Sequence, residues 1–151
     1  MKDIRVLVVD DEDDFRETFI KRLQKRELNV TGAESGEKAL EILDKLLFDV
    51  VILDVKMPGM DGVETLQEMK RIRPLMEVIM LTGHSTVEAA IEGLKLGAFD
   101  YIMKPADFDE LLEKMSQAYE KKKAHEQKIQ ESRIRELQAH PGRVFEQVKE
   151  K

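Results

Sequence analysis

Residues 50–62 read VVILDVKMPGMDG, in which four aliphatic residues are followed directly by Asp54 and then by a loop rich in proline and glycine. A short run without polar residues is typical of a central strand in a parallel sheet, because helices cover both faces of such a sheet. The Pro-Gly and Asp-Gly pairs that come next favour a turn. We therefore interpret 49–53 as a buried strand that ends at a carboxylate.

The alternation of short apolar runs with apolar residues at helical spacing occurs five times along the chain. This pattern predicts single helices that join parallel strands through right-handed crossovers. Five such units suit a doubly wound α/β sandwich with helices on both faces, whereas a barrel needs eight. The expected strands are 4–9, 28–33, 49–53, 76–81 and 99–103, and the expected helices are 14–26, 36–47, 63–72, one capped by Ser85 or Thr86 and closed by Gly97, and a long one from Asp107.

Composition narrows the class of protein. The chain has 151 residues, of which 42% are hydrophobic, which suits one domain with some chain left over. The absence of cysteine excludes disulfides and thiolate metal sites. No apolar stretch approaches the length of a membrane span, and the N-terminus lacks the features of a signal peptide, so we expect a cytoplasmic protein without membrane contact.

Charge is unevenly distributed along the chain. The net charge is −6, but residues 118–151 hold nine Lys or Arg and six Asp or Glu, so the rest of the chain carries an excess of nine negative charges. An acidic body disfavours nucleic acid as its own ligand, and an acidic pocket within it favours a cation.

Polar side chains come directly after four of the apolar runs. The residues are Asp10 and Asp11 after VLVV, Asp54 after VVIL, Thr82 after VIML and Lys104 after YIM. Ligands of open α/β sheets bind beyond the carboxyl ends of the strands. In a sheet ordered 2-1-3-4-5 the first and third strands are neighbours, so we expect these side chains to meet at one edge.

Taken alone, each of these residues has an ordinary explanation as well. Asp10 and Asp11 are possible helix caps, Asp54 a possible turn residue, and Lys104 an ordinary surface lysine. Together, three carboxylates favour Mg²⁺, an ionised carboxylate can accept a phosphoryl group, and an ammonium binds phosphate oxygens. The set predicts a phosphoryl-transfer site that needs no general base, and His84 is expected to face solvent rather than to act as one.

Residues 1–120 resemble the receiver domain of two-component response regulators in four stretches: VLVVDDEDD, VVILDVKMPGMDG, VIMLTGHS and GAFDYIMKP. The resemblance implies a flavodoxin-like fold and a phosphorylatable aspartate at Asp54. It also implies an Mg²⁺ ion held directly by Asp11 and Asp54, through water by Asp10, and by the backbone carbonyl of Lys56.

The resemblance further implies a conformational switch. Thr82 is then the switch hydroxyl, and Tyr101, which the residues alone would place in the core, is the switch aromatic. Lys104 is the phosphate-binding cation, with a cis bond to Pro105. Ala106 departs from the family pattern, because many members have Phe there. That position supports the face of the fourth helix and fifth strand. Ala106 therefore weakens the expectation of the usual dimer on that face.

The C-terminal part of the chain consists of strong helix formers. Within 118–139 the few apolar residues are unevenly spaced, which leaves three interpretations: a solvated charged helix, a helix that pairs with another chain, and a disordered segment. The HPG sequence at 140–142 predicts a break, with a short amphipathic helix over 143–150. We divide the chain into a receiver domain, 1–120, and a charged helical extension or linker, 121–151.

The expected function is that of a regulator that catalyses only its own Mg²⁺-dependent phosphorylation and dephosphorylation. A sensor histidine kinase or phosphotransfer protein would donate the phosphoryl group, and a downstream protein target or output domain would respond. A homodimer through the fourth helix and fifth strand or through the C-terminal helix is compatible with the sequence. The stretch TVEAAIEGLKLGAFDYIMKP looks most like receivers of nitrogen-regulation-type activators.

Three alternatives compete with this expectation. The chain could be the N-terminal regulatory fragment of a longer DNA-binding transcriptional activator, with 118–151 as its signalling linker. A phosphatase with an aspartate nucleophile is disfavoured, because Lys56 stands where such enzymes have a second acid. A receiver-like adaptor that is never phosphorylated normally lacks some of the acids or the lysine that are present here.

Overall fold

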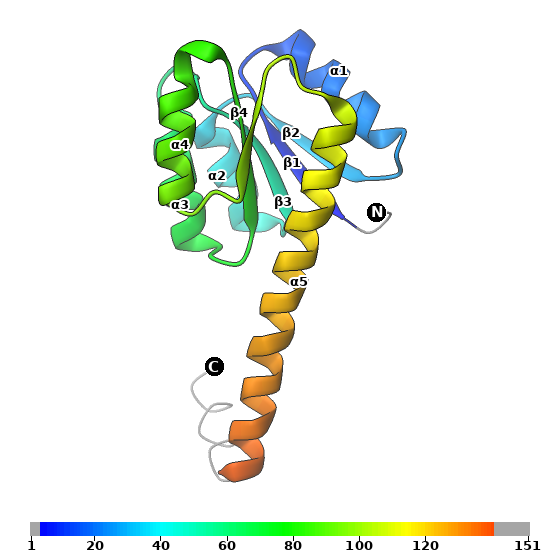
Figure 1. Cartoon of the computed structure of the whole chain (residues 1–151), viewed down its shortest axis with the longest axis vertical. Coiled ribbons are helices and arrows are strands. Elements are labelled where there is room, and N and C mark those ends of the chain that lie inside the picture. Colours follow the sequence, from blue (N-terminus) through cyan, green and yellow to red (C-terminus); the bar gives the residue numbers. More distant parts are fainter. Residues whose placement is uncertain (1–3, 141–151) are drawn as a thin grey trace.

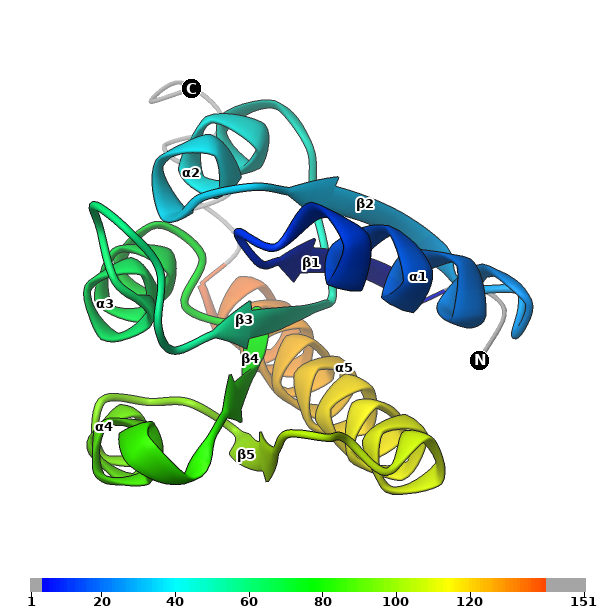
Figure 2. The same ribbon diagram turned by 90° about the horizontal axis from the view of Figure 1, so that it is seen from above.

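Five parallel strands form a single sheet in the order β2-β1-β3-β4-β5 (Figures 1 and 2). The computed structural model describes residues 4–140. The order and the parallel direction confirm the predicted doubly wound topology. The strands are β1 (Arg5–Val9), β2 (Asn29–Ala33), β3 (Val50–Asp54), β4 (Glu77–Thr82) and β5 (Asp100–Met103).

Helices cover both faces of the sheet, as the sequence predicted (Figure 2). One face packs on α1 (Asp13–Gln24) and α5 (Phe108–Ala139), and the other on α2 (Gly36–Lys45), α3 (Gly62–Ile72) and α4 (Val87–Lys95), which follows a short 3₁₀ turn, η1 (His84–Thr86). Alternate residues of each strand point to opposite faces, so the sheet serves two apolar cores. Val6, Val8, Ile52 and Leu81 pack on the α1 and α5 side, whereas Leu7, Val51, Leu53 and Met80 pack on the α2–α4 side.

Side-chain caps fix where several helices begin. The Ser35 hydroxyl accepts a hydrogen bond from the backbone N–H of Lys38, and the Asp61 carboxylate accepts one from Glu64. The Asp107 carboxylate accepts the N–H groups of the first turn of α5. After α4, Gly97 has a φ of 110°, a left-handed conformation that favours glycine, and closes that helix as predicted.

The end of α2 and the cap of α4 differ in detail from the prediction. Helix α2 ends at Lys45, and Leu46 turns into extended backbone, so Leu46 and Leu47 are 52% and 58% exposed instead of part of a buried helical face. Thr86 is the N-cap residue of α4, as predicted, but its side chain makes no capping hydrogen bond. The Thr86 hydroxyl instead contacts the hydroxyl of Thr82, because η1 precedes the helix.

The register of the strands aligns their carboxyl ends. Leu53 pairs with Val9 and with Met80, so β1, β3 and β4 end at nearly the same level. Thr82 pairs with Met103 at the end of β5. The residues that follow the strands therefore emerge along one edge.

Helix α5 continues without a break for 32 residues (Figure 1). Its first three turns pack on the sheet through Leu111, Leu112 and Met115, and its last turns extend beyond the body with Ile129 and Ile134 exposed. Residues 118–139 are thus helical and mostly exposed, which favours the interpretation as a solvated helix over the disordered one. The predicted short helix over 143–150 lies outside the described residues. None of the helices within residues 4–140 combines the length and apolarity that crossing a membrane requires.

Candidate functional site

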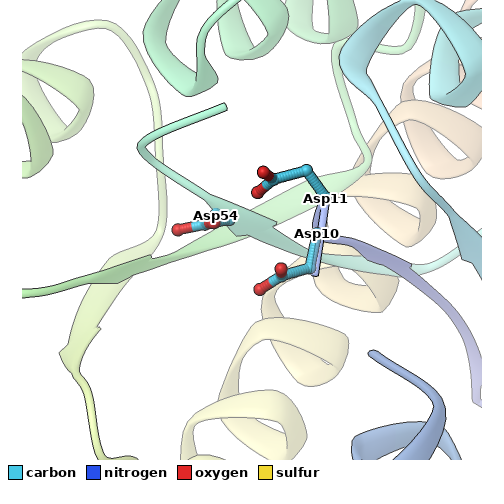
Figure 3. Close-up of side chains that lie close together, drawn as sticks. All are labelled: Asp10, Asp11 and Asp54. Carbon is cyan, nitrogen blue, oxygen red and sulfur yellow. The ribbon is translucent and has the colours of Figure 1, made fainter. Parts of the chain in front are cut away.

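Three aspartates meet at the carboxyl edge of the sheet (Figure 3). Asp10 and Asp11 lie just after β1, and Asp54 is the last residue of the neighbouring strand β3. Each offers a carboxylate oxygen, and these oxygens lie within 4.8 Å of one another. The structure therefore brings together the three carboxylates that the sequence placed at strand ends.

Lys104 supplies the positive charge beside these carboxylates. It follows β5, and its Nζ lies 3.2 Å from Oδ2 of Asp10 and 3.4 Å from Oδ1 of Asp54. The side chain of Asp10 is fully buried and also accepts the backbone N–H of Glu12 through its Oδ1. Asp10 thus fixes both the turn after β1 and the position of the ammonium. The Lys104–Pro105 peptide bond is cis.

The environment of Asp54 disfavours its ionised form in the absence of a cation. Burial, with the added repulsion of Asp10, raises the pKa of the Asp54 carboxyl to about 6, although Lys104 and the backbone N–H of Lys56 act in the opposite direction. Burial would also lower the pKa of Lys104, but the charges of Asp10 and Asp54 outweigh it, and the pKa of this lysine is raised. The ammonium therefore stays charged, and the carboxylates still lack full compensation.

Thr82 is the last residue of β4 and is fully buried. Its hydroxyl lies 3.0 Å from the carbonyl oxygen of Gly83, to which it donates, and 2.6 Å from the hydroxyl of Thr86. Thr86, Gly83 and Ser85 line the cleft above the aspartates. The hydroxyl of Thr82 is thus held by the loop that leads into α4.

Tyr101 is the second residue of β5 and is not among the residues that line the cleft beside the aspartates. It is half-buried, packs against the core on the α2–α4 side, and lines a surface hollow together with Asp100 and Pro105. Ala106 is half-buried and packs on the opposite core. The residues alone predicted a core position for Tyr101, and the structure shows a side chain that contacts the core but is only half-buried.

An open cleft of about 640 Å³ gives access to the aspartates. It is lined by Asp11, Glu12, Asp54, Lys56, Met57, Pro58, Gly83, Ser85, Thr86 and Lys104. The side chain of Lys56 is exposed on its rim. His84 is exposed and is not among the lining residues, which agrees with the expectation that it faces solvent.

The chemistry of the donors fits a hard divalent cation. All three groups are carboxylates, two of them belong to buried residues, and burial together with the charge of Asp10 raises the pKa of Asp54. A zinc site would call for nitrogen or sulfur ligands, and no such ligand is part of this cluster. The cluster can therefore hold a metal ion of the magnesium type.

Sequence reasoning missed two residues that support the site. The Arg16 guanidinium donates to the backbone carbonyl of Asp10 at 2.8 Å and pairs with Asp13 at 2.7 Å, so it fixes the turn after β1. The ring of Phe15 lies against the ammonium of Lys104. The spacing of Phe15 signalled only an amphipathic helix, and no sequence signal pointed to its contact with a residue 89 positions away.

Gly62 explains how closely the next helix approaches the site. A Cβ atom at this position would lie 2.5 Å from the carbonyl oxygen of Asp54 and 2.6 Å from Cα of Val55. Only glycine lets the start of α3 pack against the backbone that carries Asp54. The Gly-rich loop noted in the sequence thus has a packing role.

Comparison with known proteins identifies the same region of the chain. A family model described as "Response regulator receiver domain" matches residues 6–116. The crystal structure of a response regulator receiver domain protein from Clostridium thermocellum has a TM-score of 0.77 and 36% sequence identity, and the match covers 80% of this chain and 98% of that one.

Two curated relatives from Escherichia coli K12 are transcriptional regulators. The transcriptional regulatory protein ZraR is 44% identical over 108 residues, which is 72% of this chain and 24% of ZraR. The DNA-binding transcriptional regulator NtrC is 41% identical over 105 residues, which is 70% of this chain and 22% of NtrC. The likeness to nitrogen-regulation-type activators is thereby confirmed, and the chain spans about a quarter of the length of these relatives.

Proposed function

This chain belongs to the response regulator receiver domain family of two-component systems, and we propose that Asp54 is the residue that accepts the phosphoryl group in it. The observation that carries the proposal is the meeting of Asp10, Asp11 and Asp54 with the ammonium of Lys104 at one edge of the sheet. Asp54 ends the central strand β3 and faces the open cleft, so an incoming phosphoryl donor can reach it.

The proposed reaction is a phosphoryl transfer from a phosphohistidine of a sensor kinase or phosphotransfer protein. A carboxylate oxygen of Asp54 forms a bond to phosphorus, the phosphorus–nitrogen bond breaks, and the imidazole leaves with the electron pair. The product is an acyl phosphate. No general base is needed, because the acceptor oxygen carries no proton when it reacts.

Lys104 stabilises the negative charge on the transferred group. Its Nζ already lies 3.4 Å from Oδ1 of Asp54, within reach of the oxygens of a phosphoryl group bound there. A preorganised ammonium in a partly buried site is worth more than one in water. Its raised pKa keeps it protonated throughout the physiological range.

The proposed metal is Mg²⁺, with Asp11 and Asp54 as direct ligands, Asp10 as a ligand through water, and the backbone carbonyl of Lys56 as a further ligand. When bound, the ion supplies positive charge to the phosphoryl oxygens. The surplus of carboxylates over ammonium groups in the site supports this proposal.

The proposed switch uses Thr82 and Tyr101. A phosphoryl group on Asp54 offers oxygen acceptors that compete with Gly83 and Thr86 for the Thr82 hydroxyl. Movement of this hydroxyl would release the loop before α4, and Tyr101 would turn inward. Phosphorylation would in this way shift an existing equilibrium between two arrangements of the α4 and β5 face.

The proposed partners are a histidine kinase or phosphotransfer protein upstream and a protein target or output domain downstream, in the cytoplasm. We assign residues 1–120 to the receiver and 121–151 to an extension or linker, and the boundary falls inside α5. A second candidate, the regulatory part of a longer transcriptional activator, is favoured by the quarter-length match to ZraR and NtrC. Homodimers through α4 and β5 or through α5 are compatible with both.

The decisive experiment is labelling with acetyl phosphate and Mg²⁺, followed by intact-mass spectrometry. Wild-type protein should gain one acid-labile phosphoryl group, and Asp54→Asn should gain none. Asp44→Asn is the matched control, because Asp44 is an exposed aspartate on α2. One phosphoryl group retained at a single site in Asp54→Asn would refute the assignment.

A further inference from the structure

The ammonium of Lys104 has an aromatic neighbour in addition to its two carboxylates. Its Nζ lies 4.6 Å from the centroid of the Phe15 ring, at the start of α1. This distance is within the range of cation–π attraction. The lysine is therefore held by three groups that come from three segments, the turn after β1, the end of β3 and the first turn of α1.

A row of aromatic rings fixes Phe15 from behind. Phe15 is stacked on Phe19, with centroids 5.5 Å apart and an interplanar angle of 16°. Phe19 meets Phe108 of α5 edge to face at 6.3 Å, and the guanidinium of Arg22 covers the Phe108 ring at 4.2 Å. The ring that faces Lys104 is consequently held in one orientation by both helices on this side of the sheet.

The carboxylates alone are poorly suited to hold Lys104 during the reaction. When a phosphoryl group is attached to Asp54 and a cation is bound by the aspartates, the ammonium exchanges its present contacts with Asp10 and Asp54 for contacts with the phosphoryl oxygens. The face of an aromatic ring binds neither a divalent cation nor a phosphoryl group in competition with the lysine. It can therefore keep the ammonium in place when Asp10 and Asp54 are occupied.

We propose that Phe15 is a positioning residue for Lys104, which holds the ammonium beside the phosphoryl site through its ring face. The proposal rests on the proposed role of Asp54 and Lys104 in phosphoryl transfer. Phe15 is only half-buried, so its contact with Lys104 is a larger share of its surroundings than it would be for a core residue.

The first test measures the contact without any reaction. A ring above the end of the lysine side chain shifts the ε-methylene protons of Lys104 upfield, which NMR of ¹³C-lysine-labelled protein detects, with Lys104→Arg used only to assign the signal. We expect the upfield shift in wild type and in Phe15→Tyr, and its loss in Phe15→Leu. A Lys104 signal at the random-coil position in wild type would overturn the proposal.

The second test measures the consequence for the site. Phe15→Leu should slow labelling by acetyl phosphate by about five-fold and weaken binding of beryllofluoride with Mg²⁺ by a similar factor, as expected from the range of cation–π strengths. Phe15→Tyr should restore both. Phe15→Leu should lower the labelling rate at saturating acetyl phosphate, because Lys104 acts on the phosphoryl group that is being transferred.

A packing control separates positioning from stability. Leu23→Val trims a fully buried side chain of α1 eight residues after Phe15 and leaves Phe15 and Phe19 in place, so it should lower the unfolding temperature while labelling stays within about two-fold of wild type. Equal slowing by Leu23→Val and Phe15→Leu, or no slowing by Phe15→Leu, would overturn the proposal. Failure of wild type to accept any phosphoryl group would instead refute the proposed function, while the NMR result would still decide the contact.

Discussion

The two edges of the sheet use the same kinds of charged residue in opposite ways. At the carboxyl edge, Asp10, Asp11 and Asp54 gather around the ammonium of Lys104. At the amino edge, two buried acids have several partners each. Asp49 accepts the backbone N–H of Arg5 and pairs with Lys122 at 3.0 Å, and Glu77 pairs with Lys70 at 3.3 Å and with Lys121 at 3.1 Å.

This difference separates a structural role from a functional one. The charges of Asp49 and Glu77 are compensated within the protein, and they anchor α5 to the sheet through Lys122 and Lys121. The aspartates at the other edge are left with an excess of negative charge, and the pKa of Asp54 is raised as a result of its burial and of Asp10. A buried acid that is paired with lysine is compensated within the fold, whereas three clustered acids that share one lysine leave room for an added positive charge.

The largest expected effect comes from a comparison of two single substitutions, one of a lysine at the carboxyl edge and one of a lysine at the amino edge. Lys104→Gln should slow labelling by acetyl phosphate by about a hundred-fold, the usual loss when one preorganised donor to a developing charge is removed. Lys122→Gln should leave the labelling rate within about two-fold of wild type, because its partner Asp49 is at the opposite edge. Equal labelling rates of the two variants would remove the functional difference between the edges.

The second prediction concerns stability without metal. The folded-state pKa of Asp54 is about 6 against an ordinary value of 3.8, so ionisation of this group opposes folding. The stability that its protonated form supports is complete below about pH 4 and is lost as the pH rises through 6. In EDTA, Asp54→Asn should therefore be more stable than wild type by about 2–3 kcal/mol at pH 8.

The measurement is urea unfolding of both proteins at several pH values. The advantage of Asp54→Asn should shrink towards zero at pH 4. The exposed control Asp44→Asn should show no comparable pH dependence. An advantage that is constant from pH 4 to pH 8 would show that the pKa of Asp54 is not raised in the folded protein.

The third prediction concerns the amino edge, where neutralising a buried acid should lower the free energy of unfolding instead of raising it. Asp49→Asn and Glu77→Gln remove buried charges that face lysines, so each variant should lose about 1–2 kcal/mol of unfolding free energy at pH 8. Urea unfolding measures the loss, and labelling by acetyl phosphate should be unchanged. A stabilised Asp49→Asn variant would mean that its ion pair with Lys122 does not compensate its burial.

The smallest effect is expected at the hydroxyl pair behind the site. Thr86→Val removes the partner that lies 2.6 Å from the Thr82 hydroxyl, so this hydroxyl should turn towards a phosphoryl group more readily. Beryllofluoride with Mg²⁺ should bind about three-fold more tightly, as expected for one neutral hydrogen bond. Thr86→Ser keeps the hydroxyl and should bind like wild type in calorimetry. Weaker binding by Thr86→Val would contradict the proposed restraint.

The sequence predicted the sheet and the carboxyl edge well because both depend on local patterns. Apolar runs such as VVIL identify buried strands, and the residue that follows each run is placed by the topology of a parallel sheet. The meeting of Asp10, Asp54 and Lys104 needs no knowledge of side-chain packing. Strand ends differ from the prediction by about one residue, as is usual for boundaries.

The remaining features depend on contacts that a local pattern does not contain. Leu46 and Leu47 continue the apolar pattern of α2, but the chain leaves the helix before them. Asp49 and Glu77 each precede an apolar run, in mirror image of the residues at the carboxyl edge, and the sequence gives no sign of their lysine partners on α5. The contact of the Phe15 ring with Lys104 and that of the Thr86 hydroxyl with Thr82 likewise have no local sequence signal.

The continuity of α5 has a mechanical consequence. The helix starts close to Lys104, is anchored at Lys122, and continues to Ala139. The part beyond the anchor is about 26 Å long, so a tilt of about 10° at the anchor would displace its far end by about 4–5 Å. The length of α5 would therefore amplify any tilt at this anchor into a displacement of several ångströms at its far end.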